Sequence, residues 1–270
     1  MDNLWEVCVL AAAQGIAEFL PISSSGHLLV LGNWFGFDAE KSMSLNVVLH
    51  AGTLLAIVIF YFKKLLSILL DPARRRLIGL VIAGSVPAAV VGVGLKVTHL
   101  ESVIFASPYI AAAGFAVTGF MLFKVFSSHA EDKSDAVPTE KMSYKQALAI
   151  GCAQALAITP GISRSGSTIS CGVMCNLRKA DAAEFSFLLA IPAIGGAALL
   201  ETLDIIKTPE AVSNGAWLPL ALGFAVSAAV GYFSLAGLIA LLKKGRLDCF
   251  AYYLFIAALI SAAVETVKLF

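Results

Sequence analysis

Charged residues are scarce in this 270-residue chain: they make up 14% of it, whereas a soluble domain of this size carries about a quarter. Hydrophobic residues account for 59%. This balance is too apolar for a water-facing surface and is typical of a chain that crosses a bilayer several times. The sequence therefore predicts an all-α polytopic membrane protein whose surroundings are membrane lipids.

The chain also lacks a basic stripe and a cluster of soft metal ligands. Its net charge is +1, and the Lys and Arg residues do not gather as they do along a nucleic-acid groove, so no nucleic-acid partner is expected. Cys171 and Cys175 have the spacing of a metal pair on a helix, but no further soft ligand is near them in sequence. Packing is the favoured interpretation for these cysteines.

Six apolar runs are predicted to cross the membrane: 44–62, 77–95, 108–126, 183–200, 217–242 and 249–268. The other runs are joined in two pairs through Ser-rich motifs, and three of these four are shorter than the roughly 20 residues that a span needs. We interpret residues 4–36 and 146–177 as re-entrant helix–loop–helix hairpins. Irregular backbone at such depth is tolerated only when protein or a water-filled cavity surrounds it.

Positive charge predicts the orientation. If the loop at 63–76 is cytoplasmic, alternation puts residues 124–145, 178–181 and 243–248 there as well, and these four regions hold 14 of the 19 Lys and Arg. This asymmetry follows the positive-inside rule and places both termini outside the cytoplasm.

One motif occurs twice, 140 residues apart. Residues 14–27 read QGIAEFLPISSSGH, residues 154–167 read QALAITPGISRSGS, and the two are identical at six positions. Three spans follow each hairpin, so the second half is predicted to be inverted relative to the first, with the two hairpin tips meeting near the midplane. The expected division is one membrane domain with repeat 1 at about 1–126, a solvated linker at 127–145 and repeat 2 at about 146–270.

The first motif carries an acid and a histidine. Glu18 follows Gln14 by four residues, so both lie on one helix face. A carboxylate at membrane depth is costly unless paired or hydrated, so Glu18 is predicted to hold a divalent cation, to act as a base, or to pair with Arg164 and hold the hairpins together. His27 can deprotonate a Ser, protonate a leaving oxygen or attack phosphorus, or it is a packing residue.

Both tips have the composition of an anion site. Backbone N–H groups at a helix start bind anions, and guanidinium groups bind phosphate oxygens in pairs. The expected substrate has an anionic head between the tips and an apolar tail along the helices. A diphosphate beside Glu18 requires a bridging cation, for which Mg²⁺ or Ca²⁺ is expected. His50 and Glu184, in the spans that follow the hairpins, are predicted either to support this site or to pack between helices.

In these motifs the chain resembles the undecaprenyl-diphosphate phosphatases of the bacitracin-resistance type. That family shows (Glu/Gln)-x-x-x-Glu, then Pro-x-Ser-Ser-x-Gly-His, and later Pro-Gly-x-Ser-Arg-Ser-Gly-x-Thr. The matching segments here are 14–18, 21–27 and 160–168, and the stretch EFSFLLAIP at 184–192 is also similar.

The resemblance implies hydrolysis of a C55 polyprenyl diphosphate to the monophosphate and phosphate, recycling of the lipid carrier of cell-wall synthesis, bacitracin resistance, metal dependence and catalysis on the outer side of the bacterial inner membrane. It implies the catalytic residues Glu18, His27, Arg164 and Ser24, with Glu18 as the metal ligand. It implies the substrate-binding residues Gln14, Ser23, Ser25, Gly26, Ser163, Ser165, Gly166 and Thr168. Some members have Glu where this chain has Gln14, so any base role is assigned to Glu18 alone. The sequence is compatible with a homodimer.

The same residues resemble motifs of other protein classes. The string PISSSGH is similar to an element of the PAP2-type lipid phosphatases, but that family also needs Arg-Pro, which does not occur here. A Ser–His peptidase leaves Arg164 without a role. A polyprenyl-phosphate flippase is the main alternative, because inverted repeats with re-entrant tips are transporter architecture and a phosphate cradle can carry a lipid phosphate.

Overall fold

The computed structural model describes residues 4–35, 39–104, 107–127, 135–207, 217–243 and 247–267. Within these ranges the secondary structure is helical, apart from one isolated bridge between Val137 and Leu177. The helices of the first half are α1 Leu4–Phe19, α2 Ser24–Phe35, α3 Ala39–Phe60, α4 Phe62–Leu70, η1 Pro72–Arg74, α5 Arg75–Val97, α6 Leu100–Ile104 and α7 Pro108–Phe126. Those of the second half are η2 Thr139–Lys141, α8 Tyr144–Leu156, α9 Arg164–Met174, α10 Lys179–Lys207, α11 Trp217–Lys243 and α12 Asp248–Val267.

The protein is a multi-pass helical membrane protein. Among the described residues, five helices are long and apolar enough to cross a bilayer, and a sixth span is present if the bent pair Ser44–Phe60 and Phe62–Leu70 is counted as one. Large apolar side chains cover the outside, for example Val90 at 66% and Phe233 at 72% exposure. Such a surface is stable against lipid and would be costly against water. The predicted helical membrane fold is confirmed at this level.

The third helix bends where the sequence predicted a span followed by a loop. α3 and α4 meet at 68° around Tyr61, whose backbone leaves helical geometry at φ −96° and ψ 13°. Tyr61 itself is buried and packs against Phe60 and Phe187. The predicted loop at 63–76 begins as helix α4, with Lys63 and Lys64 in its first turn.

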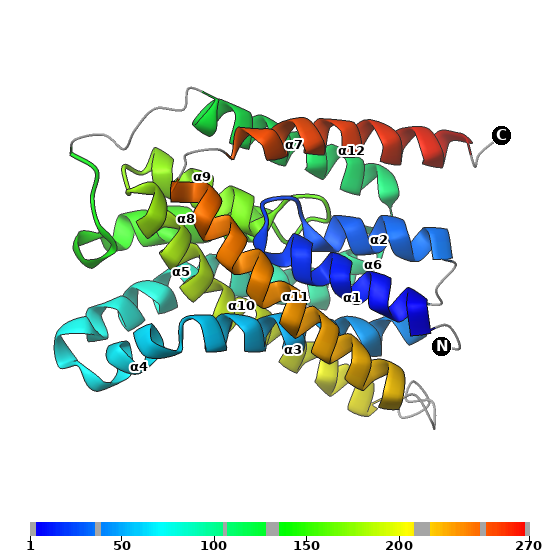
Figure 1. Ribbon diagram of the computed structural model, residues 1–270, viewed down its shortest axis with the longest axis horizontal. Helices are drawn as coiled ribbons and strands as arrows, with labels where there is room; N and C mark the ends of the chain where they lie inside the picture. The colour runs from blue at the N-terminus through cyan, green and yellow to red at the C-terminus, as the bar shows by residue number, and fades with distance from the viewer. Residues whose placement is uncertain are drawn as a thin grey trace.

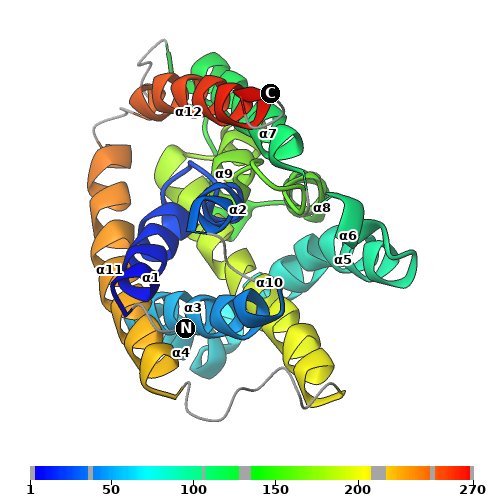
Figure 2. The same ribbon diagram turned by 90° about the vertical axis from the view of Figure 1, so that its right-hand side faces the viewer.

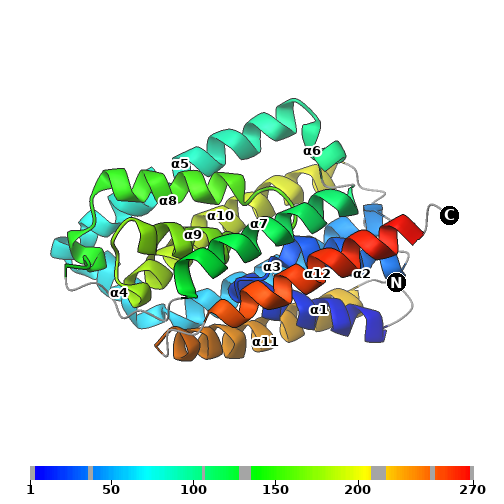
Figure 3. The same ribbon diagram turned by 90° about the horizontal axis from the view of Figure 1, so that it is seen from above.

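The helices run roughly along one long axis, and α1 begins at the same end as α12 finishes (Figures 1 and 3). α1 and α2 form one hairpin and α8 and α9 form another, and each hairpin packs on itself. The two hairpins occupy opposite halves of this axis, with their turns near the middle (Figure 1). The first helix of each hairpin packs against a long helix of the other half: α1 on α11, and α8 on α5.

Helix α7 packs against both hairpin turns. It contacts α2 and α9 on one side and pairs closely with α12 on the other, and the end-on view shows α9 beside the α7–α12 pair (Figure 2). Gly114 of α7 lies against the turn before α9: an added Cβ would be 2.4 Å from the Pro160 carbonyl oxygen. Gly161 has φ +85°, and its added Cβ would be 2.0 Å from the Ala111 oxygen. These glycines let backbone touch backbone at the junction.

The described part of the linker, residues 135–143, is folded against the rest of the chain, while Asp135, Glu140, Lys141 and Ser143 are exposed. Val137 exchanges backbone hydrogen bonds with Asn176 and Arg178, and Met142 is fully buried. Arg76 of α5 donates to the carbonyl of Met142 at 2.6 Å. Polar composition hid this docking, because the segment is held mainly by hydrogen bonds, among them those from the Thr139 backbone N–H and hydroxyl to Asp181, each 2.8 Å long. Residues 128–134 of the linker lie outside the described ranges.

Candidate active site

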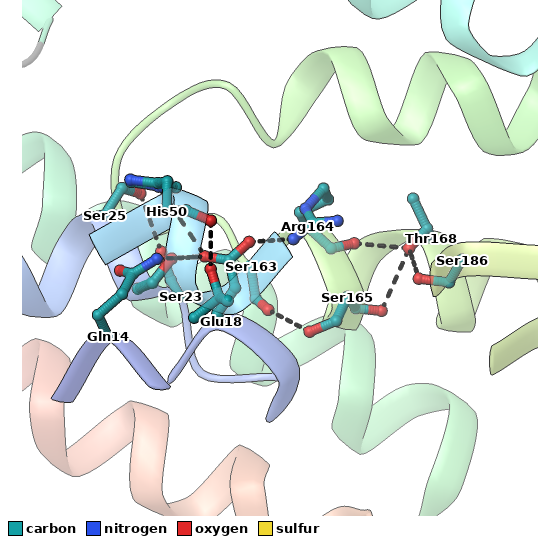
Figure 4. Close-up of polar contacts among 12 residues, drawn as sticks. Gln14, Glu18, Ser23, Ser25, His50, Ser163, Arg164, Ser165, Thr168 and Ser186 are labelled. Atoms are coloured by element: carbon teal, nitrogen blue, oxygen red, sulfur yellow. Dashed lines mark hydrogen bonds and ion pairs between the residues drawn. The ribbon is translucent and has the colours of Figure 1, made fainter. Parts of the chain in front are cut away.

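An ion pair joins the two halves at the point where the hairpin turns meet. Arg164, the first residue of α9, donates from Nη2 to Glu18 Oε1 near the end of α1 (Figure 4). The Glu18 side chain is 4% exposed and that of Arg164 is 16% exposed. The predicted meeting of these two residues is confirmed. The ion pair also agrees with the interpretation that Glu18 pairs with Arg164 to hold the hairpins together.

Three further groups surround the Glu18 carboxylate. Oε2 accepts from Gln14 Nε2 at 3.0 Å and from Ser24 Oγ at 2.6 Å. His50 of α3 lies on the same side, with Nε2 4.0 Å from Oε2, and its Nδ1 is bonded to the Asn46 carbonyl (Figure 4). The structure therefore supports the prediction that His50 lies by the site. Glu184, its counterpart in that prediction, instead pairs with Lys64 at 2.9 Å.

The first turn is capped by its own serine. Ser23 Oγ accepts from the Gly26 N–H at 3.4 Å and lies 3.3 Å from Ser25 Oγ. Ser23 has φ +70°, a left-handed conformation that is uncommon for a residue with a side chain. Gly26 faces protein: an added Cβ would be 2.6 Å from the Phe115 ring and 2.9 Å from Gly161. Gly26 is thus a packing position at which the two turns touch.

The second turn repeats this cap. Ser163 Oγ accepts from the Gly166 N–H at 3.1 Å and lies 3.2 Å from Ser165 Oγ (Figure 4). Ser165 Oγ donates across the junction to the Leu20 carbonyl at 3.2 Å. Helix α7 supplies Thr118, whose Oγ1 accepts from the Ser163 N–H at 2.9 Å. These contacts fix the first turn of α9, and with it the start of the Arg164 side chain.

Exposure divides the predicted site residues into two groups. Ser24, Ser25, His27 and Arg164 are partly exposed. The other predicted residues are buried: Gln14, Glu18, Ser23, Gly26, Ser163, Ser165, Gly166 and Thr168. Thr168, for example, is fully buried and bonds to Ser186 of α10 at 2.6 Å (Figure 4). Groups in the first set can meet a ligand directly. In the second set, Ser23 and Ser163 cap the helices that follow the two turns, whereas Glu18 and Gln14 lie behind Ser24 and Arg164.

His27 lies one helical turn after Ser24 on α2, and its ring faces α12. Nδ1 is 2.7 Å from the Ser23 carbonyl, and Nε2 is 2.6 Å from the hydroxyl of Tyr253. Sequence reasoning missed Tyr253, Thr118 and Ser186, because a single hydroxyl in an apolar helix belongs to no motif. Only the fold shows that they face the two turns.

The site's donor set fits a hard divalent cation in part. The amide of Gln14 donates from Nε2 to Glu18, while its Oε1 atom is buried without a hydrogen-bond partner among the described residues. Carboxylate and amide oxygens are ligands that Mg²⁺ and Ca²⁺ accept, and Mg²⁺ is often held by one carboxylate together with substrate phosphates. Among the described residues no group of three His, Cys, Asp or Glu side chains is placed to hold a metal. Substrate oxygens would therefore have to complete the shell around Glu18 and Gln14.

Fold and site together define an integral membrane protein with a buried acid–guanidinium centre, suited to an anionic group that has an apolar body. Residues 7–260 match the model of the bacitracin resistance protein BacA family. The chain belongs to that family.

Relatives across nearly the whole length carry one name. An undecaprenyl-diphosphatase of Rhodopirellula baltica is 42% identical over 260 residues, covering 96% of this chain and 97% of that protein. One from Rubrobacter xylanophilus is 39% identical over 277 residues, covering 97% and 98%. One from Methanosphaera stadtmanae is 36% identical over 289 residues, covering 99% and 100%. The family that the sequence motifs resembled is thereby confirmed.

Proposed function

We propose that the chain is an undecaprenyl-diphosphatase, which hydrolyses a C55 polyprenyl diphosphate to the monophosphate and inorganic phosphate. The observation that carries this is the contact of Ser24 and Arg164 with one buried carboxylate, Glu18, at the junction of the two turns. A hydroxyl on an acid and a guanidinium beside it are the groups that phosphoryl transfer needs for attack and for charge stabilisation. The activity recycles the lipid carrier of peptidoglycan synthesis and confers bacitracin resistance.

The geometry favours Ser24 as the nucleophile. Its Oγ–H is directed at Glu18 Oε2, 2.6 Å away, so the carboxylate can take the proton as the oxygen attacks. The Nε2 atom of His27 is occupied by Tyr253. Ser24 Oγ, unlike His27 Nε2, is therefore in contact with a base.

The reaction then runs in two steps. Ser24 Oγ bonds to the terminal phosphorus, its proton passes to Glu18, and the bond to the bridging oxygen breaks with its electron pair leaving on the polyprenyl monophosphate. Water next attacks the phosphoserine, Glu18 returns the proton to Ser24 Oγ, and inorganic phosphate departs with the atoms of the water. Arg164 has five N–H donors and spends one terminal nitrogen on Glu18, so it has donors left for phosphate oxygens.

A bound Mg²⁺ or Ca²⁺ would neutralise the negative charge that a diphosphate brings beside Glu18. Glu18 and Gln14 Oε1 are the protein ligands that we assign to it. We expect chelation to lower phosphate release by purified protein and added Mg²⁺ or Ca²⁺ to restore it. Gln14→Leu should raise the Mg²⁺ concentration needed for half-maximal activity; an unchanged requirement would remove Gln14 from the ligand set.

The topology that supports this reaction is an inverted repeat with two re-entrant hairpins in the bacterial inner membrane, the site opening to the outer side. The hairpins lie in opposite halves of the long axis, and the exchanged packing of α1 on α11 and α8 on α5 supports the repeat. A cysteine at Ser25, in an otherwise cysteine-free protein, tests the opening: an impermeant thiol reagent added outside should label it. Labelling only from the cytoplasmic side would reverse the orientation.

The flippase alternative has no support, since the named relatives are phosphatases. The deciding assay is phosphate release from a polyprenyl diphosphate by purified protein in detergent. Ser24→Ala should lower the rate by about 10²-fold or more, the scale for loss of a group that acts in the transition state. Ser85→Ala, in α5 with its hydroxyl on the Val81 carbonyl, is the matched control and should be unaffected.

The outcomes separate the claims. A wild-type protein that releases no phosphate would overturn the function, whereas a fully active Ser24→Ala variant would overturn only the nucleophile. Acid quenching during turnover should trap phosphate on Ser24.

A further inference from the structure

His27 is held from two sides by aromatic residues of different helices. The ring of Tyr253, in α12, stacks on the imidazole with centroids 5.7 Å apart and planes at 8°. The ring of Phe115, in α7, lies 4.9 Å away at 57°. α7 and α12 are themselves tightly paired. A side chain clamped in this way has little freedom to change its orientation.

The hydrogen bonds at His27 define its tautomer. The partner of Nδ1 is the Ser23 carbonyl, 2.7 Å away, and a carbonyl oxygen can only accept, so Nδ1 carries the hydrogen. In the neutral ring Nε2 is then the acceptor, and the Tyr253 hydroxyl, 2.6 Å away, is its donor. Tyr253 therefore fixes both the plane of the ring and the nitrogen that carries the lone pair.

This clamp acts on the first turn of the site. Ser23, which receives the Nδ1 hydrogen, is the residue with φ +70°, and Ser24, on Glu18, follows it directly. The bond from His27 thus ties the ring to the carbonyl just before the nucleophile. Tyr253 is a residue of the second half that holds a ring of the first half, in the same sense as Arg164, which reaches from the second half to Glu18.

We propose that Tyr253 is a positioning residue for the phosphatase reaction, which holds His27 as the Nδ1–H tautomer with Nε2 at the edge of the site. The inference rests on the proposed function and assigns Tyr253 no contact with substrate. Its hydroxyl serves by orienting the imidazole, and through Ser23 the backbone that presents Ser24.

Tyr253→Phe tests this, because it keeps the stacked ring and removes only the hydroxyl. We expect kcat to fall about 3- to 10-fold, the change that follows from losing one neutral hydrogen bond, with KM for the polyprenyl diphosphate unchanged. Tyr252→Phe is the matched control: it is the same substitution one residue earlier, on a ring that packs edge-on against Phe123. It should leave kcat as in the wild type.

A double variant shows whether the effect passes through His27. With His27→Ala in place, adding Tyr253→Phe should change kcat no further. In ¹⁵N-labelled protein, the His27 ring should show one protonated and one hydrogen-bonded nitrogen. In Tyr253→Phe the acceptor nitrogen should lose the signature of its hydrogen bond, which a purely structural role would not produce in a protein that melts normally.

Each outcome has one meaning. Normal kcat in Tyr253→Phe beside an impaired His27→Ala overturns the inference and leaves the proposed function intact. Equal losses from Tyr253→Phe with and without His27 show that the tyrosine acts independently, and they also overturn it. Absence of phosphate release from the wild type is instead a failure of the proposed function.

Discussion

The two hairpin turns share one scaffold and differ in what they offer a ligand. In each, a serine caps the following helix through the N–H three residues later, and its Oγ lies beside the serine two residues on. The first turn leaves Ser24, Ser25 and His27 partly exposed, whereas the second buries its hydroxyls and presents Arg164. A repeated motif can thus keep its capping hydrogen bonds in both copies while the partly exposed polar side chains differ between them.

Backbone strain also differs between the copies. Ser23 has φ +70°, whereas Ser163 has φ −72°, and the second turn places its positive φ on Gly161 instead. Left-handed backbone is easy for Gly and costs a residue with a Cβ roughly 1–2 kcal/mol. The strained serine stands immediately before the proposed nucleophile, as strain at functional sites often does.

The acid position marks the largest difference. Four residues after Gln14 the first copy has Glu18, and four after Gln154 the second has Ile158. Gln154 is buried, and among the described residues neither atom of its amide has a hydrogen-bond partner. The glutamine has therefore been retained in both copies, while the carboxylate that it supports is present in one.

Removing either charge of the Glu18–Arg164 pair should have the largest effect. Glu18→Ala and Arg164→Ala are each expected to lower phosphate release by about 10²–10³-fold, because each removes a group that stabilises or activates the transition state. The melting temperature should also fall, because the remaining charge is left buried and unpaired. Initial rates and thermal melts on the same preparations check both effects. Near-normal rates in either variant would show that the ion pair only holds the hairpins together.

Close backbone contacts of the two hairpins give the next effect. Gly151 of α8 lies against Gly84 of α5, and a Cβ added to Gly151 would be 2.2 Å from the Gly84 carbonyl oxygen. Gly15 of α1 lies against Gly231 of α11, and a Cβ added to Gly15 would be 2.8 Å from the Gly231 backbone nitrogen. We expect Gly151→Ala to lower the melting temperature more than Gly15→Ala, in proportion to the tighter contact. Gly237→Ala has open space around it and should be neutral or stabilising, since Ala favours a helix over Gly by about 1 kcal/mol. Equal melting temperatures for all three variants would contradict these packing contacts.

The caps should give the smallest effect. Ser163→Ala removes the 3.1 Å hydrogen bond from the Gly166 N–H, at a residue with relaxed backbone. Ser23→Ala removes the 3.4 Å hydrogen bond from the Gly26 N–H, at a residue with strained backbone. Loss of an N-cap costs about 0.5–2 kcal/mol, so Ser163→Ala is expected at the upper part of this range and Ser23→Ala at the lower part. Denaturation of the two variants in the same detergent gives the comparison. A larger loss at Ser23 would mean that the first cap stabilises the protein more than the length of its hydrogen bond indicates.

Much of this arrangement could be predicted from the sequence, because apolar length and repeated motifs are local signals. The six long runs coincide with the helices α3, α5, α7, α10, α11 and α12, and the doubled motif led to the pairing of Glu18 with Arg164. The break at Tyr61 was not predicted, since no Pro or Gly marks it in the sequence.

The second layer of the site depended on tertiary contacts. Thr118 and Tyr253 are ordinary residues in apolar helices, and only the approach of α7 and α12 to the turns brings their hydroxyls to Ser163 and His27. For Glu184 the sequence left two interpretations open, support of the site and contact between helices, and its ion pair with Lys64 of α4 agrees with the second.

The ion pair between Glu18 and Arg164 can form only after both residues have been synthesised. The two residues are 146 apart in the chain, so at ribosomal speeds of about 5–20 residues per second the acid waits on the order of ten seconds for its partner to be synthesised. Throughout that interval an uncompensated carboxylate is unfavourable in hydrocarbon. The amino-terminal hairpin therefore has to be sheltered, hydrated or protonated at the translocon until the carboxy-terminal half arrives to dock it.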